Sequence, residues 1–255
     1  SLLTASDAFH TSSFDSFTPQ VPTIYSISGC KQPTIGEIIR RNVLPEYSAI
    51  PAPPPNATEY QVKKISGDKT VPLASADALD IPSVNRFYFT KADHAKMPSQ
   101  DILRQWIATL IDGSSDTSTL PNNITHDKTA CKLKGKFFSV HSPVDVHVYD
   151  ANGNHLGLDP NGDIEEFIDG ADYEDIDHNK FIFLPEDEGQ QYDIRLDGTG
   201  NGVFQLRVTD IVDDEPMNTA YYNDVPVQQG SQGTLTLGTT SADTSLLVDT
   251  DNNGA

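Results

Sequence analysis

The spacing of hydrophobic residues along the chain changes character near residue 129. Before that position, continuous apolar runs and one long amphipathic segment are separated by turn residues; after it, apolar and polar residues alternate in short runs. A period of two residues is typical of strands with one buried face, whereas a period of about 3.6 residues indicates a helix. The pattern therefore predicts two units of different structural class.

The first part of the chain carries the signals of strands and helices. Three runs rich in β-branched or aromatic residues predict strands: Val21–Ile27, Gln61–Ile65 and Asn85–Thr90. Thr34 and Glu37 form a capping-box pair ahead of two isoleucines, which predicts a short helix. A longer helix is predicted from Ser99, as N-cap, to Gly113, as terminator. Its apolar residues recur at i, i+3 and i+4 spacing: Ile102, Leu103, Trp106, Ile107, Leu110 and Ile111.

Beyond residue 128 the alternation predicts an antiparallel β-sandwich. Val144, Val146 and Val148 alternate with polar residues and precede Asn152-Gly153, a dipeptide typical of two-residue hairpin turns. Similar alternation recurs further along: Tyr192–Leu196, Phe204–Val208 and Leu235–Leu237. This spacing is that of an immunoglobulin-like sandwich of roughly seven strands.

The charge of the chain is concentrated in its second half. Of the formal net charge of −20, residues 1–128 carry −2 and residues 129–255 carry −18. We therefore predict two domains with these bounds. Strong acidity disfavours phosphate backbones and anionic membrane surfaces, so neither nucleic acid nor a polybasic membrane anchor is expected as a partner. No apolar run is long enough to predict a transmembrane segment.

The two cysteines, Cys30 and Cys131, allow two interpretations. They could form one disulfide or remain two buried thiols, and their wide separation in the sequence leaves both open. Two cysteines cannot by themselves form a cysteine-based zinc site. Asn-x-Thr sequences at Asn56 and Asn123 are glycosylation-acceptor patterns, relevant if the source glycosylates secreted chains.

Asp68 and His94 are the candidate catalytic residues. Asp68 lies in a Gly-Asp-Lys-Thr-Val-Pro segment after a predicted strand, and His94 follows the next predicted strand and precedes the long helix. In a catalytic triad the histidine takes a proton from a nucleophile, while a carboxylate holds its other ring nitrogen. The order acid and then base is that of α/β-hydrolases. Asp93 is a competing acid, but a sequence neighbour on an extended segment points the other way.

At these positions the chain resembles the lecithin:cholesterol acyltransferase-like branch of the α/β-hydrolases, a group of lipases, phospholipases and acyltransferases. The resemblance covers about residues 15–111 and rests on three segments: Ile24–Thr34, Gly67-Asp68-x-Thr70-Val71-Pro72 and His94-x-x-Met97. It implies that Asp68 is the triad acid and His94 the triad base, and that residues 1–20 descend from the lid over the acyl pocket. Residues 1–128 would then be the C-terminal part of an α/β-hydrolase domain.

The chain departs from that family because it has no Gly-x-Ser-x-Gly motif. The nearest string, Ser26-Ile27-Ser28-Gly29, lacks the first glycine. We therefore expect the nucleophile and the first half of the sheet upstream of Ser1, so that this chain supplies the acid and base and is catalytically incomplete alone. The expected substrate is a lipid or another acyl ester, and the expected location is secreted or on the cell surface. The alternative is a non-catalytic extracellular protein made of binding or spacer modules.

Three acidic segments have the spacing of calcium-binding loops: Asp249–Gly254, Asp150-x-Asn152-x-Asn154 and Asp159-x-Asn161-x-Asp163. The closing carboxylate of the first would fall beyond Ala255, and neither of the others is followed by one. Asx turns are therefore the favoured interpretation; no cofactor is expected to be required, and calcium stays open as a ligand. The remaining histidines have no metal-ligand spacing, and no role is predicted for them: His141, His147, His155 and His178 among others.

Overall fold

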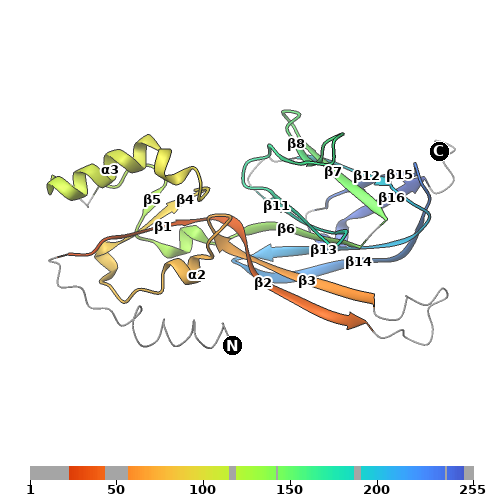
Figure 1. The fold of residues 1–255 in the computed structure, drawn as a ribbon, viewed down its shortest axis with the longest axis horizontal. Coiled ribbons are helices and arrows are strands. Elements are labelled where there is room, and N and C mark those ends of the chain that lie inside the picture. Colours follow the sequence, from red (N-terminus) through yellow and green to blue (C-terminus); the bar gives the residue numbers. More distant parts are fainter. Residues whose placement is uncertain are drawn as a thin grey trace. The chain divides into compact units, whose positions relative to one another are not determined.

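The computed structural model of the chain describes residues 23–43, 57–114, 119–141, 143–186, 191–238 and 240–249. The chain divides into two compact units, one made of residues 1–34 and 65–132 and the other of residues 35–64 and 133–255 (Figure 1). The chain passes between the units within β2 (Gln32–Val43) and again within β3 (Ala57–Gly67), which together form a two-stranded sheet.

The first unit contains a small mixed sheet. β1 (Ser26–Cys30) runs parallel to β4 (Arg86–Thr90), and β4 pairs on its other side with the antiparallel β5 (Ile124–Thr125). Phe87 and Phe89 of β4 belong to one hydrophobic cluster, and Tyr88 between them belongs to another. Because successive side chains of a strand point to opposite faces, both faces of this sheet are covered.

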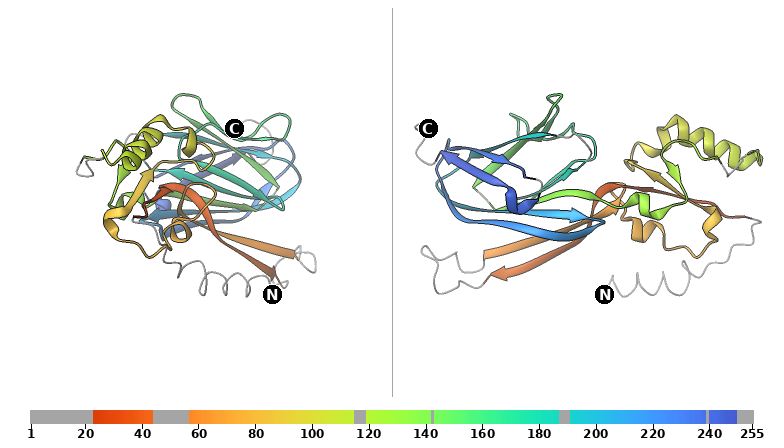
Figure 2. Two further views of the ribbon diagram at one scale, coloured as in Figure 1. Left: turned by 60° about the vertical axis from the view of Figure 1, so that its left-hand side comes forward. Right: turned by 180° about the vertical axis from the view of Figure 1, so that it is seen from behind.

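One face of the sheet is covered by α3 (Asp101–Asp112), as Figures 1 and 2 show. Its buried residues Leu103, Trp106 and Leu110 recur at helical spacing and pack with Phe87. The helix ends at Gly113, whose left-handed φ of 72° is typical of a glycine that terminates a helix. The predicted long helix is confirmed, but Gln100 occupies its N-cap, and the Ser99 hydroxyl donates to the Lys96 carbonyl instead.

The other face of the sheet packs against a disulfide and a short helix. Cys30 and Cys131 are bonded, with Cα atoms 5.3 Å apart, which settles the two interpretations of these cysteines in favour of a disulfide. Leu73 of α2 (Leu73–Ala76) and Tyr88 complete this buried cluster. The described residues of the same unit also include short 3-10 helices: η2 (Ser83–Asn85), η3 (Met97–Ser99) and η4 (Lys128–Cys131).

The second unit is built from two antiparallel sheets. The five-stranded sheet has the order β10-β11-β6-β13-β14, and the six-stranded sheet has the order β16-β15-β12-β7-β8-β9. The strands of the first sheet are β6 (Lys134–His141), β10 (Asp172–Ile176), β11 (Asn179–Pro185), β13 (Gly202–Val212) and β14 (Glu215–Val227). Those of the second are β7 (Val144–Asp150), β8 (His155–Leu158), β9 (Ile164–Glu166), β12 (Tyr192–Gly198), β15 (Gln232–Thr236) and β16 (Ser245–Asp249), with η5 (Ser241–Asp243) before the last.

A single hydrophobic core lies between these two sheets. Phe138 and Val140 of β6 belong to the same buried cluster as Val146 and Val148 of β7, on the opposite sheet. Along β7 every second residue belongs to this core, as a pair of packed sheets requires: Val144, Val146 and Val148.

The predicted fold class is wrong. In place of the C-terminal part of an α/β-hydrolase domain, the described residues contain only two α-helices, and the first unit has a three-stranded sheet with just one parallel pair. The helix predicted at Thr34–Glu37 is part of strand β2, where pairing with β3 overrides the local capping signal. The two packed sheets of the second unit together have eleven described strands rather than the roughly seven of an immunoglobulin-like sandwich.

Candidate functional site

Asp68 is held in a tight turn directly after β3. Gly67 forms a bridge with Pro72 across the turn, and Lys69 adopts a left-handed φ of 73°. The backbone N–H of Lys69 donates to the Thr34 hydroxyl at 2.9 Å. A Cβ on Gly67 would lie 2.4 Å from the Val71 carbonyl oxygen, so this turn requires glycine there.

The Asp68 carboxylate has a partner for each oxygen. Its Oδ1 accepts the backbone N–H groups of Thr70 and Val71 at 3.1 and 2.7 Å, and its Oδ2 lies 2.8 Å from Nδ1 of His94. The side chain is only 8% exposed. An ionised carboxylate is purely a hydrogen-bond acceptor, and this arrangement of donors suits that state.

His94 is fixed at its backbone and at one ring nitrogen. Its N–H donates to the Asp68 carbonyl at 2.8 Å, while its side chain is 51% exposed. Because the carboxylate can only accept, Nδ1 carries the proton of the bond to Asp68, and the neutral ring therefore has its lone pair on Nε2. Within the described part of the chain no residue makes a hydrogen bond to Nε2. This nitrogen is therefore free to accept a proton from a substrate or a nucleophile.

Asp93, the competing acid, is oriented away from this pair. Its Oδ1 accepts the N–H of Ala95 at 3.0 Å, and its Oδ2 lies 3.6 Å from the Lys96 ammonium. The structure thus brings together the two residues singled out from the sequence, Asp68 and His94, and leaves Asp93 in its own exposed turn.

The end of β1 packs directly against this pair. A Cβ on Gly29 would lie 2.8 Å from the Asp68 Cβ and 2.6 Å from the Met97 sulfur. Strand β1 can therefore lie this close to Asp68 only because residue 29 is glycine. Ser28, in the string nearest to a nucleophile motif, is buried, and its hydroxyl lies 3.5 Å from the Ala76 carbonyl. This serine is not positioned as a nucleophile for His94.

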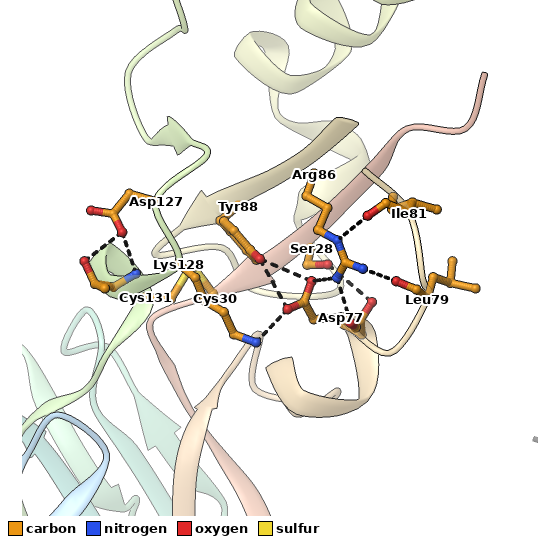
Figure 3. Close-up of polar contacts among 12 residues, drawn as sticks. Ser28, Cys30, Asp77, Leu79, Ile81, Arg86, Tyr88, Asp127, Lys128 and Cys131 are labelled. Carbon is orange, nitrogen blue, oxygen red and sulfur yellow. Dashed lines mark hydrogen bonds and ion pairs between the residues drawn. A yellow bond between two sulfur atoms is a disulfide. The ribbon is translucent and has the colours of Figure 1, made fainter. Parts of the chain in front are cut away.

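A charged network fixes the start of β4, the strand that leads to His94 (Figure 3). The Asp77 carboxylate accepts from Arg86 and Lys128, each at 2.6 Å, and from the Tyr88 hydroxyl at 3.2 Å. Arg86 also donates to three carbonyl groups of the preceding segment: those of Asp77, Leu79 and Ile81. Burial acts to raise the pKa of Asp77, but the hydrogen bonds and charges of Lys128 and Arg86 outweigh it and hold that pKa below its usual value.

Two of the three calcium-like segments are Asx turns. The Asp150 carboxylate accepts the N–H groups of Asn152 and Asn154, and the Asp159 carboxylate accepts those of Asn161 and Asp163. The third segment, Asp249–Gly254, lies outside the described residues after Asp249. In the described ranges, no group of three or more His, Cys, Asp or Glu side chains gathers as a metal site would require.

Sequence spacing missed one cluster in the second unit. His147 and His155 lie on neighbouring strands with ring nitrogens 3.1 Å apart, and Glu165 binds the far side of His155 at 2.7 Å. Cross-strand neighbours have no fixed spacing along the chain, so only the strand alternation and the Asn152-Gly153 turn could have indicated this pairing.

Comparisons with known proteins do not assign this chain to a family. No protein-family model, no curated protein and no solved structure matches the chain. None of the described helices is long and apolar enough to cross a membrane.

Proposed function

We propose that Asp68 and His94 are the acid and the base of a serine-type acyl-ester hydrolase or acyltransferase. The observation that carries this proposal is a buried carboxylate 2.8 Å from Nδ1 of an imidazole whose Nε2 is open. The sequence segments around Asp68 and His94 support this proposal. They resemble the corresponding segments of lecithin:cholesterol acyltransferase-like enzymes, which act on lipid and other acyl esters.

The nucleophilic serine is supplied by a segment outside these 255 residues, since the sequence has no Gly-x-Ser-x-Gly motif. As the serine oxygen attacks the ester carbonyl carbon, His94 Nε2 takes the hydroxyl proton and then gives it to the departing alcohol. Asp68 holds Nδ1 and stabilises the imidazolium. Water, or an acceptor alcohol in a transferase, then releases the acyl group by the same two proton transfers. Side chains perform every step, so no cofactor is required.

A secreted or surface-exposed location is part of the same proposal. The Cys30–Cys131 disulfide supports it, because structural disulfides persist mainly in oxidising compartments. The net charge of −20 further disfavours anionic polymers as partners.

The test is to express this chain joined to the coding sequence that precedes Ser1 and to measure p-nitrophenyl ester hydrolysis and labelling by a fluorophosphonate. We expect activity and one labelled serine. His94→Ala and Asp68→Asn should each lower the activity about 10³-fold or more, with little change in the melting temperature.

The matched controls are Asp93→Asn, which changes the neighbouring acid, and His178→Ala, which removes an exposed histidine of the second unit; both should retain activity. If no serine is labelled, or if His94→Ala keeps normal activity, the catalytic proposal is wrong. The remaining candidate would then be a non-catalytic binding or spacer protein, which the large antiparallel second unit favours.

A further inference from the structure

Three ionisable side chains meet where β3 contacts β10, the edge strand of the five-stranded sheet. The Lys64 ammonium of β3 lies 2.5 Å from Asp172 Oδ2 and 3.2 Å from Glu174 Oε1, both on β10. Asp172 and Glu174 are two positions apart, so they share one face of their strand. Lys64 and Asp172 are buried, and Glu174 is partly exposed. An amine and a carboxyl group are thus held in contact, with a second carboxyl group beside the amine.

Aromatic side chains flank this cluster. In the pairing of β10 with β11, Phe183 stands opposite Asp172 and Phe181 stands opposite Glu174. Both phenylalanines are buried. Because directly opposite residues of neighbouring strands have their side chains on the same face, the two rings lie beside the carboxyl groups. The amine and the Asp172 carboxyl group therefore occupy surroundings of low polarity.

The Asp172 carboxyl group is held in its neutral form more readily than that of an exposed aspartate. Burial raises the pKa of Asp172 to about 6; the charge of Lys64 opposes this rise, and those of Glu166 and Glu174 add to it. In the described part of the chain, the buried Oδ2 has no hydrogen-bond donor other than the Lys64 ammonium. The neutral acid is the form of a carboxyl group that an amine can attack, and a desolvated lysine is the more nucleophilic amine.

We propose that Lys64 and Asp172 condense to an amide, an isopeptide cross-link between β3 and β10, with Glu174 transferring the protons. The ammonium first passes a proton to Asp172 through Glu174, which leaves a neutral amine beside a neutral acid. The nitrogen lone pair then attacks Cγ of Asp172 and forms the N–C bond. Glu174 takes a proton from the nitrogen and gives it to the departing hydroxyl. The C–O bond breaks, one water molecule leaves, and Glu174 returns to its starting state.

The folded chain favours a condensation that does not proceed between free groups in water. Reacting groups held about 3–3.5 Å apart behave as though at effective concentrations of about 10⁵–10⁸ M. The released water leaves apolar surroundings, which opposes the reverse hydrolysis. An unfolded chain has neither advantage, so the bond forms only after β3 has docked against β10. Until then, Lys64 and Asp172 remain an ion pair, and the pH dependence of that ion pair belongs to the unreacted chain.

A second buried lysine–aspartate pair of the same unit provides a comparison. Lys136 Nζ lies 2.8 Å from Asp210 Oδ1, but Asp210 Oδ2 accepts the backbone N–H and the hydroxyl of Ser241. Burial acts to raise the pKa of Asp210, but the hydrogen bonds from Lys136 and Ser241 outweigh it and hold that pKa below its usual value. Asp210 therefore stays ionised, and this pair is expected to remain unlinked.

The experiment is mass spectrometry of the full chain with its disulfide reduced. We expect the natively purified protein to be lighter than its sequence by one water molecule, and digestion to give a branched peptide that joins Lys64 to Asp172. Lys64→Arg and Asp172→Ala should keep the full mass. Glu174→Gln should slow cross-linking after refolding from denaturant about 10²–10⁴-fold. Asp175→Asn, which changes an exposed carboxylate of the same strand, is the matched control and should cross-link at the wild-type rate.

Three results would overturn the proposal. These are a natively purified wild type with the full sequence mass, a cross-link between Lys136 and Asp210 instead, or cross-linking of Glu174→Gln at the wild-type rate. The mass of the wild type decides whether the bond forms even where a variant fails to fold. Its outcome is independent of the ester hydrolase proposal, which uses none of these residues.

Discussion

At the scale of single residues, the Asp68 carboxylate serves both the turn and the histidine. One oxygen closes the turn by accepting two backbone N–H groups, and the other orients His94. An amide at residue 68 can still accept from the turn, but it can also present N–H to the imidazole. The two roles can therefore be separated by comparing an asparagine with an alanine.

We expect Asp68→Asn to keep the stability of the turn while changing the tautomer of His94 from Nδ1–H toward Nε2–H. Asp68→Ala should in addition lower the free energy of unfolding by about 1 kcal/mol, because the partly buried N–H groups of Thr70 and Val71 lose their acceptor. Imidazole ¹⁵N shifts report the tautomer and urea unfolding reports the stability. An unchanged Nδ1–H tautomer in Asp68→Asn would contradict the assigned orientation of this pair.

A second residue-scale feature is a buried ion pair in the second unit. The Lys64 ammonium, with a side chain 1% exposed, lies 2.5 Å from the Asp172 carboxylate and 3.2 Å from that of Glu174. Burial raises the pKa of Asp172 to about 6, against the opposing charge of Lys64. In an unfolded chain the pKa of an aspartate is about 3.9. At a pH between these two pKa values, Asp172 is mostly protonated in the folded protein and mostly ionised in the unfolded chain.

The stability contributed by the Asp172 proton is therefore present below pH of about 4 and is lost as the pH rises through about 6. Asp172→Asn mimics the protonated form at every pH. We expect the wild type, before Lys64 and Asp172 react, to lose on the order of 2–3 kcal/mol relative to Asp172→Asn between pH 4 and 7, measured by urea unfolding. Asp175→Asn, on the exposed side of the same strand, should show no such trend. A constant difference between wild type and Asp172→Asn would refute the raised pKa.

At the scale of elements, the parts that the sequence predicts correctly are those with a strong local pattern. Helix α3 and strand β7 follow their periodicity, because the apolar face that the sequence shows is the face that is buried. Strands β3 and β4 include the β-branched or aromatic runs that predicted them. Strand β2 was missed, since the local pairing of Thr34 with Glu37 competes with strand pairing that only the folded chain provides. Strand β5, of two residues, is too short to produce a pattern.

The packing of α3 gives a prediction at this scale. Trp106 is 5% exposed and contacts the ring of Phe87 edge-on, with centroids 5.6 Å apart. We expect Trp106→Ala to cost about 3–5 kcal/mol of unfolding free energy, because the cavity cannot collapse fully. Ile111→Ala, on the same helix but 82% exposed, should change stability by less than about 0.5 kcal/mol. Circular dichroism during urea unfolding compares the two, and equal losses would contradict the assigned helix face.

At the scale of the whole molecule, the chain contains two units with separate cores. The change in hydrophobic spacing near residue 129 predicts a domain boundary there, but it does not indicate that residues 35–64 belong to the second unit. The contact between Lys64 and Glu174 joins residues 110 positions apart, and no local signal encodes such a pairing. Likewise, the Asp68–His94 pair could be proposed from motif spacing, whereas the histidines of β7 and β8 could not.

The disulfide lies wholly within the first unit and should stabilise that unit alone. It joins residues 101 positions apart, and removing such a link typically costs 2–5 kcal/mol. The only tryptophan, Trp106, lies in the first unit and so reports its unfolding by fluorescence. In a Cys30→Ser, Cys131→Ser variant we expect the fluorescence transition to move to lower urea concentration. The far-UV transition of the second unit should stay in place, and an equal shift of both would contradict the division into units.

The return of the chain through β3 has a consequence for synthesis on the ribosome. Lys64 emerges 110 residues before Glu174, which at about 5–20 residues per second corresponds to a delay of roughly 5–20 s. During that interval residues 35–64 have been made, but most of the strands of their unit do not yet exist. A segment that is synthesised before most strands of its unit is thus among the last to gain its native neighbours.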